Sequence, residues 1–383
     1  MTALSLDLTG AQVLVPGEGL AEARLSLTDG QIVDAPMGRA VDLNGYMVLP
    51  GIVDVHGDGF ERHLAPRRGA MKAMNEGIAA AEAELAANGM TTAVLAQFVS
   101  WEGGLRGEEF ADQVFTAVRQ TAPDLVTDLR PQLRFETHLL DAFATLPARV
   151  RNWGVRYVVF NDHLPHERLA EGRTPRRLNG QALKAGRSPE RHLALMQALH
   201  AGSGDVPVAL DGLCRELEVQ GIAMGSHDDR TEADRAIWRA RGVRVTEFPE
   251  TLEAAEAARA GGDAIVLGAP NVVRGGSHNG NVSALDLIAM GLCDALASDY
   301  HYPSPRRAAL LIADSGLLSF EEAWRLVSAG PAKVLGLNDR GTLHSGQRAD
   351  LLVLDAETRR VAATLAQGRV SYMNGDVAAR FMG

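Results

Sequence analysis

The chain has 383 residues, of which 46% are hydrophobic and 22% charged, as in ordinary globular proteins. This length suits one α/β barrel of roughly 250 residues with a small second domain. The formal net charge of −10 argues against a nucleic-acid partner, because such proteins usually carry basic stripes. An anionic substrate stays open, since bound divalent metals and a few arginines can reverse the local field.

The sequence carries no pattern typical of secretion or membrane insertion. No apolar run approaches the roughly 20 residues that span a bilayer, and the first positive side chain is Arg24. Cys214 and Cys293 stand in apolar segments without a CxxC pair, which favours buried small hydrophobes over a zinc site or a disulfide. We therefore predict a cytoplasmic protein without a membrane partner.

Both ends of the chain read as short strands and turns. Alternating apolar residues precede the hairpin signal Asp29-Gly30, and Asn374-Gly375 marks another turn near the C-terminus. Chain termini often lie close together in space. We predict that residues 1–48 and 340–383 form one small β-sandwich and that residues 49–339 form the inserted domain.

The inserted domain alternates strand-like and alanine-rich helix-like segments, which predicts a parallel sheet with helical crossovers. Eight strand-like runs favour a closed (β/α)₈ barrel: YMVLPGIVDV, TTAVLAQFV, LRFETHLL, VRYVVFND, GIAMGSH, VRVTEFP, DAIVLGAP and CDALASDY. A doubly wound open sheet is the alternative, weakened because no GxGxxG follows the first run. The polar segment 164–190 reads as a long loop, either over the site or simply solvated.

Polar residues stand at the carboxyl ends of these runs, where barrel active sites form. His56 and Asp58 are two apart and therefore point to one side of a strand. Imidazole with carboxylate suits zinc, iron or manganese. An H-x-D pair alone is only weak evidence for a metal site.

Glu136 and His138 lie inside the apolar run LRFETHLL. A buried carboxylate needs a cation or a salt bridge. Glu136 is therefore a candidate bridging ligand of two ions, and a pair with Arg134 is the structural alternative. His138 is a candidate for a substrate contact or for a supporting position behind the ligands.

Three further residues end apolar runs: His163, His227 and Asp299. Each histidine alone is more often structural, but together with His56, Asp58 and Glu136 they form a plausible ligand set. Asp299 has a second candidate role, as the base that takes a proton from the attacking water. The alternative for Asp299 is a cap of the helix after Pro303. His301 is a candidate substrate contact.

Two segments are candidates for binding phosphate. The glycine-rich segment 268–287 passes into a helix, where backbone N–H groups bind anions well. A basic patch after the first strand is the second candidate, although ordinary loops and solvated charges explain both segments equally simply. The candidate residues are Arg274, Ser277, His278 and Asn279 in the first, and Arg62, His63, Arg67 and Arg68 in the second.

The strings LPGIVDVHGD, GMTTAV, SHDD, SDY and RGTLHSGQRADLLVLD resemble the amidohydrolase superfamily. The resemblance runs the full length and implies a metal-dependent (β/α)₈ barrel flanked by a β-sandwich from both chain ends. HGDGFERHLAPRRG, SHDDRTEAD, EFPETLEAAEAAR, GAPNVVRGGSHNGNVSALDL and SDYHYPSP resemble, more narrowly, the PhnM family. The members of that family are α-D-ribose 1-methylphosphonate 5-triphosphate diphosphatases of the carbon–phosphorus lyase pathway.

The resemblance implies two divalent ions, with zinc as first choice and manganese or iron as alternatives. It places His56 and Asp58 at the first-strand pair, which is H-x-H in most relatives. Glu136 matches the position of a carboxylated lysine, His163 and His227 the later histidines, and Asp299 the last-strand aspartate. The reaction that the resemblance implies is attack of water, activated by the ions, on the α-phosphorus of the sugar phosphonate triphosphate, with pyrophosphate as the leaving group.

Two rival functions remain at this point. One is hydrolysis of a C–N bond in a cyclic amide or deamination of a ring, which uses the same ligands but fewer cationic donors. The other is a non-catalytic barrel in the carbon–phosphorus lyase system. The presence of all six candidate ligands argues against this second rival. The sequence fixes neither the metal, the phosphonate substituent, nor the oligomeric state, although barrels of this kind are often dimers.

Overall fold

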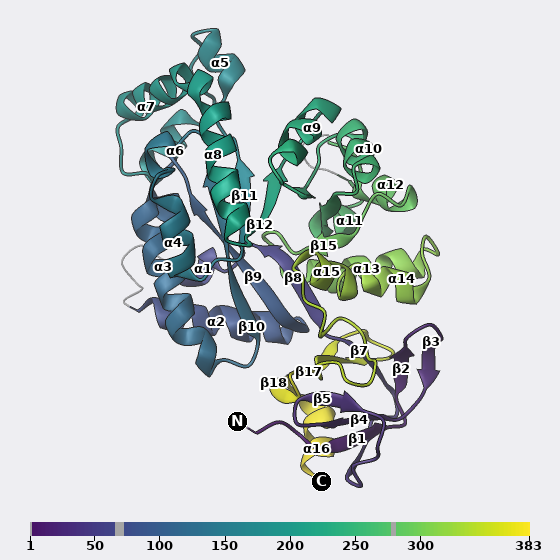
Figure 1. The fold of residues 1–383 in the computed structure, drawn as a ribbon. Helices are drawn as coiled ribbons and strands as arrows, with labels where there is room; N and C mark the ends of the chain where they lie inside the picture. Colours follow the sequence, from purple (N-terminus) through teal and green to yellow (C-terminus); the bar gives the residue numbers. More distant parts are fainter. Residues whose placement is uncertain (1, 66–72, 277–280) are drawn as a thin grey trace. The chain divides into compact units, whose positions relative to one another are not determined.

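The computed structural model describes residues 2–65, 73–276 and 281–383 (Figure 1). The chain divides into two compact units. The first unit comprises Met1–Leu95, Gln120–Arg130 and Ile265–Gly383, and the second comprises Ala96–Arg119 and Pro131–Ala264.

Seven of the predicted runs and the second half of the first run form one eight-stranded parallel sheet whose strands follow each other in sequence order. The first half of the first run, Tyr46–Pro50, is a separate strand of another sheet. Gly57, which ends the first of these strands, bridges to Asp299, two residues beyond the last, so the sheet nearly closes. This is the predicted (β/α)₈ barrel, and the strand order excludes the doubly wound alternative. The strands are β8 (Ile52–Gly57), β9 (Met90–Val99), β10 (Asp128–Glu136), β11 (Tyr157–Asn161), β12 (Ala223–His227), β13 (Val245–Glu247), β14 (Ala264–Gly268) and β15 (Ala295–Ala297).

Capping residues stabilise the N-termini of several helices. Ser188 caps the helix that Pro189 begins, and Thr231 with Asp234 forms a capping box at another. No helix in the described ranges is long and apolar enough to cross a membrane. The helices are α1 (Glu61–Leu64), α2 (Met74–Ala87), α3 (Glu108–Thr121), α4 (Leu146–Trp153), α5 (His166–Ala170), α6 (Leu178–Lys184), α7 (Pro189–Ala201), α8 (Val206–Val219), α9 (Glu232–Ala240), α10 (Leu252–Ala260), α11 (Ala269–Arg274), α12 (Ala284–Ala289), α13 (Ser304–Asp314), α14 (Phe320–Arg325), α15 (Ala329–Val334) and α16 (Gly375–Met382).

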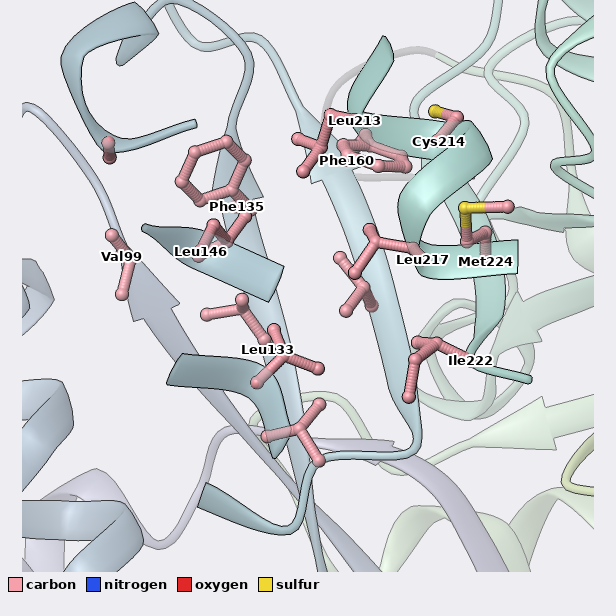
Figure 2. Close-up of a cluster of buried hydrophobic side chains, with 14 of the residues drawn as sticks. Val99, Leu133, Phe135, Leu146, Phe160, Leu213, Cys214, Leu217, Ile222 and Met224 are labelled. Atoms are coloured by element: carbon pink, nitrogen blue, oxygen red, sulfur yellow. The ribbon is translucent and has the colours of Figure 1, made fainter. Parts of the chain in front are cut away.

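The core of the second unit lies between its strands and the helices α4 and α8 (Figure 2). Leu133 and Phe160 from the strands share this cluster with Leu213 and Leu217 of α8. Cys214 belongs to the same core, and burial raises the pKa of its thiol to about 12. Both cysteines are buried free thiols, as predicted.

The two ends of the chain build two further sheets in the first unit. Strand β7 from the N-terminal part pairs antiparallel with β16 from the C-terminal part, with Val48 opposite Val353. Both sheets share one hydrophobic cluster, which includes Leu6, Leu27 and Leu351. The exact domain boundaries stay predictions. The sheets have the orders β5-β4-β1-β6 and β18-β17-β16-β7-β2-β3, built from β1 (Leu6–Thr9), β2 (Gln12–Val15), β3 (Gly19–Glu22), β4 (Leu25–Thr28), β5 (Gln31–Val33), β6 (Ala40–Asp42), β7 (Tyr46–Pro50), β16 (Leu351–Asp355), β17 (Val361–Ala366) and β18 (Arg369–Met373).

The prediction of a long loop at 164–190 is wrong. This segment contains α5, α6 and the start of α7. Its helices are short because glycines at 172 and 186 adopt positive φ angles of 65° and 66° and interrupt them. Leu178 packs with Trp101 and Met196 in a small separate hydrophobic cluster. This burial stabilises helices that the polar composition of the segment does not predict.

A buried ion network lies under the ends of β12 and β13 in the second unit. Arg235 is fully buried and donates to Asp229 at 2.9 Å and to Asp263 at 2.8 Å. Asp229 also accepts from the hydroxyls of Ser226 and Thr246, each at 2.6 Å. The network therefore ties the segment after His227 to the neighbouring strand.

Removing Asp263 takes away one of the two carboxylates that compensate the buried Arg235. Asp263→Asn should lower the free energy of unfolding by about 1.5–3 kcal/mol at pH 7, measured by urea unfolding. Asp211→Asn, which breaks an exposed pair with Arg241, is the matched control and should cost less than about 1 kcal/mol. Equal effects of the two variants would contradict this account.

The same variant has a defined pH dependence. Burial would raise the pKa of Asp263, but hydrogen bonds and charge from Arg239 and Arg235 outweigh it and leave the pKa lowered. A carboxyl group whose pKa is lower in the folded than in the unfolded protein stabilises the fold at pH values above its unfolded pKa. This contribution is lost as the pH falls through the folded pKa. The stability gap between wild type and Asp263→Asn should therefore shrink below about pH 4.

Candidate active site

Glu136 is the last residue of β10 and its side chain is completely buried in the second unit. Its Oε2 accepts hydrogen bonds from Trp101 Nε1 and from the His163 backbone N–H, each at 3.2 Å. Its Oε1 contacts His163 Nδ1. A histidine at the next strand end is therefore a partner of this carboxylate.

His163 lies two residues beyond β11. Burial would lower the pKa of its imidazole, but the hydrogen bond and charge of Glu136 outweigh that effect and raise the pKa. Its ring centroid lies 6.4 Å from that of His227. The structure thus brings together three of the predicted ligands, Glu136, His163 and His227, within one unit.

His227 ends β12, and its two ring nitrogens have different neighbours. Nδ1 lies 2.9 Å from Asp228 Oδ2, while Nε2 lies 3.0 Å from Arg134 Nη2. The Arg134 guanidinium also stacks over the Phe98 ring at 4.0 Å. A guanidinium group therefore faces Nε2 of the His227 imidazole.

Glu247 is a buried acid that the sequence reasoning missed. It ends β13, pairs in register with His227, and offers an oxygen within 4.8 Å of that histidine's ligand atom. Tyr157 and Gln132 donate to its Oε1 at 2.7 and 3.1 Å. The signal was present, because Glu247 ends the apolar run VRVTEFP just as Glu136 ends LRF.

The chain turns sharply after three of the barrel strands. Asp228, Phe248 and Asp299 follow β12, β13 and β15 with positive φ angles of 61°, 55° and 54°. Such backbone costs about 1–3 kcal/mol for residues other than glycine and is concentrated at functional sites. These turns aim side chains at the carboxyl end of the sheet.

In the first unit the backbone holds His56, Asp58 and Asp299 together. The Asp299 N–H donates to the His56 carbonyl at 3.0 Å, and the Asp58 N–H donates to the Asp299 carbonyl at 2.9 Å. His56 is fully buried at the end of β8. Asp299 is no cap of α13, whose N-cap residue is Pro303.

Asp54, on the same side of β8, is a second acid that the sequence reasoning missed. It accepts from the Ser298 N–H at 2.9 Å and from the Ser298 hydroxyl at 2.5 Å. Burial raises the pKa of Asp54 to about 7. A Cβ on Gly57 would lie 2.6 Å from Asp54 Oδ2, so glycine is required there.

The basic candidates of the first unit converge on Tyr300, the residue after Asp299. Arg62 Nη1 donates to the Tyr300 carbonyl at 3.4 Å, and Arg274 Nη1 donates to its hydroxyl at 2.7 Å. Glu84 binds Arg62 and also lies 2.6 Å from His63 Nε2. One arginine from each of the two segments proposed as alternative phosphate sites therefore contacts Tyr300.

The remaining candidates differ in what the structure says of them. His301 Nδ1 lies 2.6 Å from the Ser304 hydroxyl, and burial together with Arg307 and Arg62 lowers the pKa of this histidine. Ser277, His278 and Asn279, with Arg67 and Arg68, lie outside the described residues.

A cavity of about 800 Å³ opens in the second unit beside His163 and His227. His138 and His166 line its wall together with Asp162. Within the second unit, the mixed imidazole and carboxylate donors Glu136, His163 and His227 fit a first-row transition metal. In particular, the fully buried Glu136 carboxylate has the chemistry that a bound cation would compensate.

Comparisons with known proteins agree with this architecture. Residues 285–378 match the model of the Amidohydrolase family. The chain is similar to Alpha-D-ribose 1-methylphosphonate 5-triphosphate diphosphatase of Escherichia coli (strain K12), with 33% identity over 328 residues, which is 82% of this chain and 85% of the relative.

Solved structures share the fold at low identity. N-acyl-D-glutamate deacylase from Bordetella bronchiseptica, complexed with zinc, matches at a TM-score of 0.60 and 15% identity over 97% of both chains. N-acetylglucosamine-6-phosphate deacetylase from Pasteurella multocida matches at 0.61 and 12% identity over 97% of this chain and 100% of that one. The identity to the E. coli relative and its coverage show the family: this chain is a hydrolase of the amidohydrolase superfamily and belongs to its PhnM family.

Proposed function

We propose that the chain hydrolyses α-D-ribose 1-methylphosphonate 5-triphosphate to the 5-phosphate and pyrophosphate in phosphonate catabolism. The similarity to the E. coli diphosphatase supports this substrate. The observation that carries the proposal is the convergence of Arg62 and Arg274 on Tyr300, beside Asp299. Guanidinium groups recognise phosphate oxygens, whereas hydrolysis of a cyclic amide has no need of them.

The proposal includes two divalent ions, zinc before manganese or iron. The residues that would hold them are His56, Asp58 and Asp299 in the first unit and Glu136, His163 and His227 in the second. Glu247 adds a carboxylate beside His227. When bound, such ions lower the pKa of water and offset negative charge on phosphoryl oxygens.

Asp299 is the proposed general base. Its carboxylate accepts a proton from the attacking water while the water oxygen bonds to the α-phosphorus. The bond from the α-phosphorus to the bridging oxygen breaks, and pyrophosphate leaves with that electron pair. Asp299 suits this task because two backbone hydrogen bonds fix its position against β8 and a general base must be held within reach of its proton.

Phosphorus NMR in ¹⁸O-labelled water tests the reaction directly. The metal-loaded protein, given the ribose phosphonate triphosphate, should release pyrophosphate and place the label on the sugar 5-phosphate. Orthophosphate release, or label in pyrophosphate, would contradict attack at the α-phosphorus. Parallel assays with hydantoins and amino-purines test the rival C–N hydrolase, which is excluded if only the triphosphate turns over.

Replacing the proposed base should slow chemistry without unfolding the protein. Asp299→Asn should lower kcat by about 10²–10⁴-fold, because the amide cannot accept the proton. Asp314→Asn, at the exposed end of α13, is the matched control and should leave kcat unchanged. Wild-type kcat in Asp299→Asn would remove this residue from the proton transfer.

Arg274 should contribute to binding of the triphosphate. Arg274→Ala should lower kcat/KM by roughly 10–100-fold, since a hydrogen bond to a charged group contributes about 1.5–3 kcal/mol. Steady-state kinetics measure this, with the exposed Arg360→Ala variant as control. Unchanged kinetics in Arg274→Ala would contradict the role of this arginine.

A further inference from the structure

A second cluster of ligand-type side chains lies on the cavity wall in the second unit. It consists of His138, Asp162 and His166, whose potential ligand atoms all lie within 4.8 Å of one another. His138 follows β10 and Asp162 follows β11, while His166 begins α5. None of these three belongs to the ligand set proposed for the hydrolytic centre.

The distances inside the cluster match those between ligands of one ion. His138 Nδ1 lies 3.5 Å from Asp162 Oδ1, and His166 Nε2 lies 3.0 Å from Asp162 Oδ2. Ligands at about 2.0–2.2 Å from a tetrahedral or octahedral ion are roughly 3.0–3.6 Å apart. The Thr137 hydroxyl also lies 3.3 Å from His138 Nδ1.

Each imidazole also has a partner for its other nitrogen. His138 Nε2 lies 3.2 Å from the Ser203 hydroxyl, which donates to the His200 carbonyl at 2.7 Å. His166 Nδ1 lies 2.8 Å from His200 Nδ1. Metal-ligating histidines characteristically donate their second N–H in this way, which fixes the tautomer and the ring orientation.

The charge of the cavity wall favours a cation at this place. Two arginines, Arg168 and Arg230, line the cavity, and Arg230 is already paired with Glu250. Without bound cations an anionic ligand in this cavity would be repelled. The carboxylates of the wall are Asp162, Glu167, Asp228, Asp229, Asp234 and Glu250.

We propose that His138, Asp162 and His166 form an additional divalent transition-metal site, with His200 and Ser203 supporting the ligands. Three protein ligands leave coordination positions open, and Asp162 and His166 are 42% and 33% exposed on the cavity wall. The site is independent of the hydrolytic reaction, so its test uses no substrate.

Zinc titration of the metal-free full chain, followed by calorimetry and elemental analysis, tests the site. His166→Ala and Asp162→Asn should each bind one ion fewer per chain than wild type. His344→Ala, an exposed histidine that contacts Thr342, should bind as many ions as wild type. Circular dichroism of each variant checks that the fold is retained.

Cobalt substitution gives a second measurement. The absorption spectrum of the cobalt-loaded protein should contain a component from cobalt at this site. His166→Ala should lose that component, and His344→Ala should keep it. Equal ion counts in wild type, His166→Ala and Asp162→Asn would overturn the proposal, as would identical cobalt spectra. Either result is read without reference to turnover, so a failure here is distinct from a failure of the proposed function.

Discussion

The buried carboxylate of Glu136 sets the main constraint on the second unit. A charge removed from water is costly unless hydrogen bonds and an opposite charge compensate it. Here Trp101 and His163 supply the N–H groups, and the hydrogen bond and charge of Glu136 in turn raise the pKa of His163. The ends of β10 and β11 are therefore linked through one side chain.

Backbone strain and a buried ion network hold the neighbouring strand ends in place. Arg235 and Asp229 lie beneath the turn at Asp228, and that turn follows His227. The hydrogen bonds of Asp229 with Ser226, Thr246 and Arg235 therefore anchor the residue that follows this turn.

The sequence was sufficient for the barrel because parallel strands buried on both faces give continuous apolar runs. Polar residues at the ends of those runs then identified Glu136, His163 and His227 as neighbours. Glu247 and Asp54 were not predicted as site residues, because each lies inside a segment that was assigned only to a strand. Both are nevertheless buried acids in apolar runs, as Glu136 is.

Other features depend on tertiary packing and could not be predicted from local patterns. Helices α5 and α6 form because Leu178 finds a hydrophobic cluster, which no local pattern of the polar segment 164–190 reveals. The meeting of Arg62 and Arg274 at Tyr300 joins segments more than 200 residues apart. Their proximity follows from closure of the sheet between β8 and β15, not from spacing along the chain.

In the proposed metal centre, a bound cation compensates the negative charge of the Glu136 carboxylate. The most direct measurement is scanning calorimetry of the metal-free and zinc-loaded protein, with elemental analysis of the bound ions. Zinc should raise the Tm of wild type and of the exposed Glu108→Gln variant equally, since an ion that binds only the folded state stabilises it. Glu136→Gln should bind fewer ions and show a smaller rise in Tm. A full complement of zinc and an unchanged rise in Glu136→Gln would contradict the account.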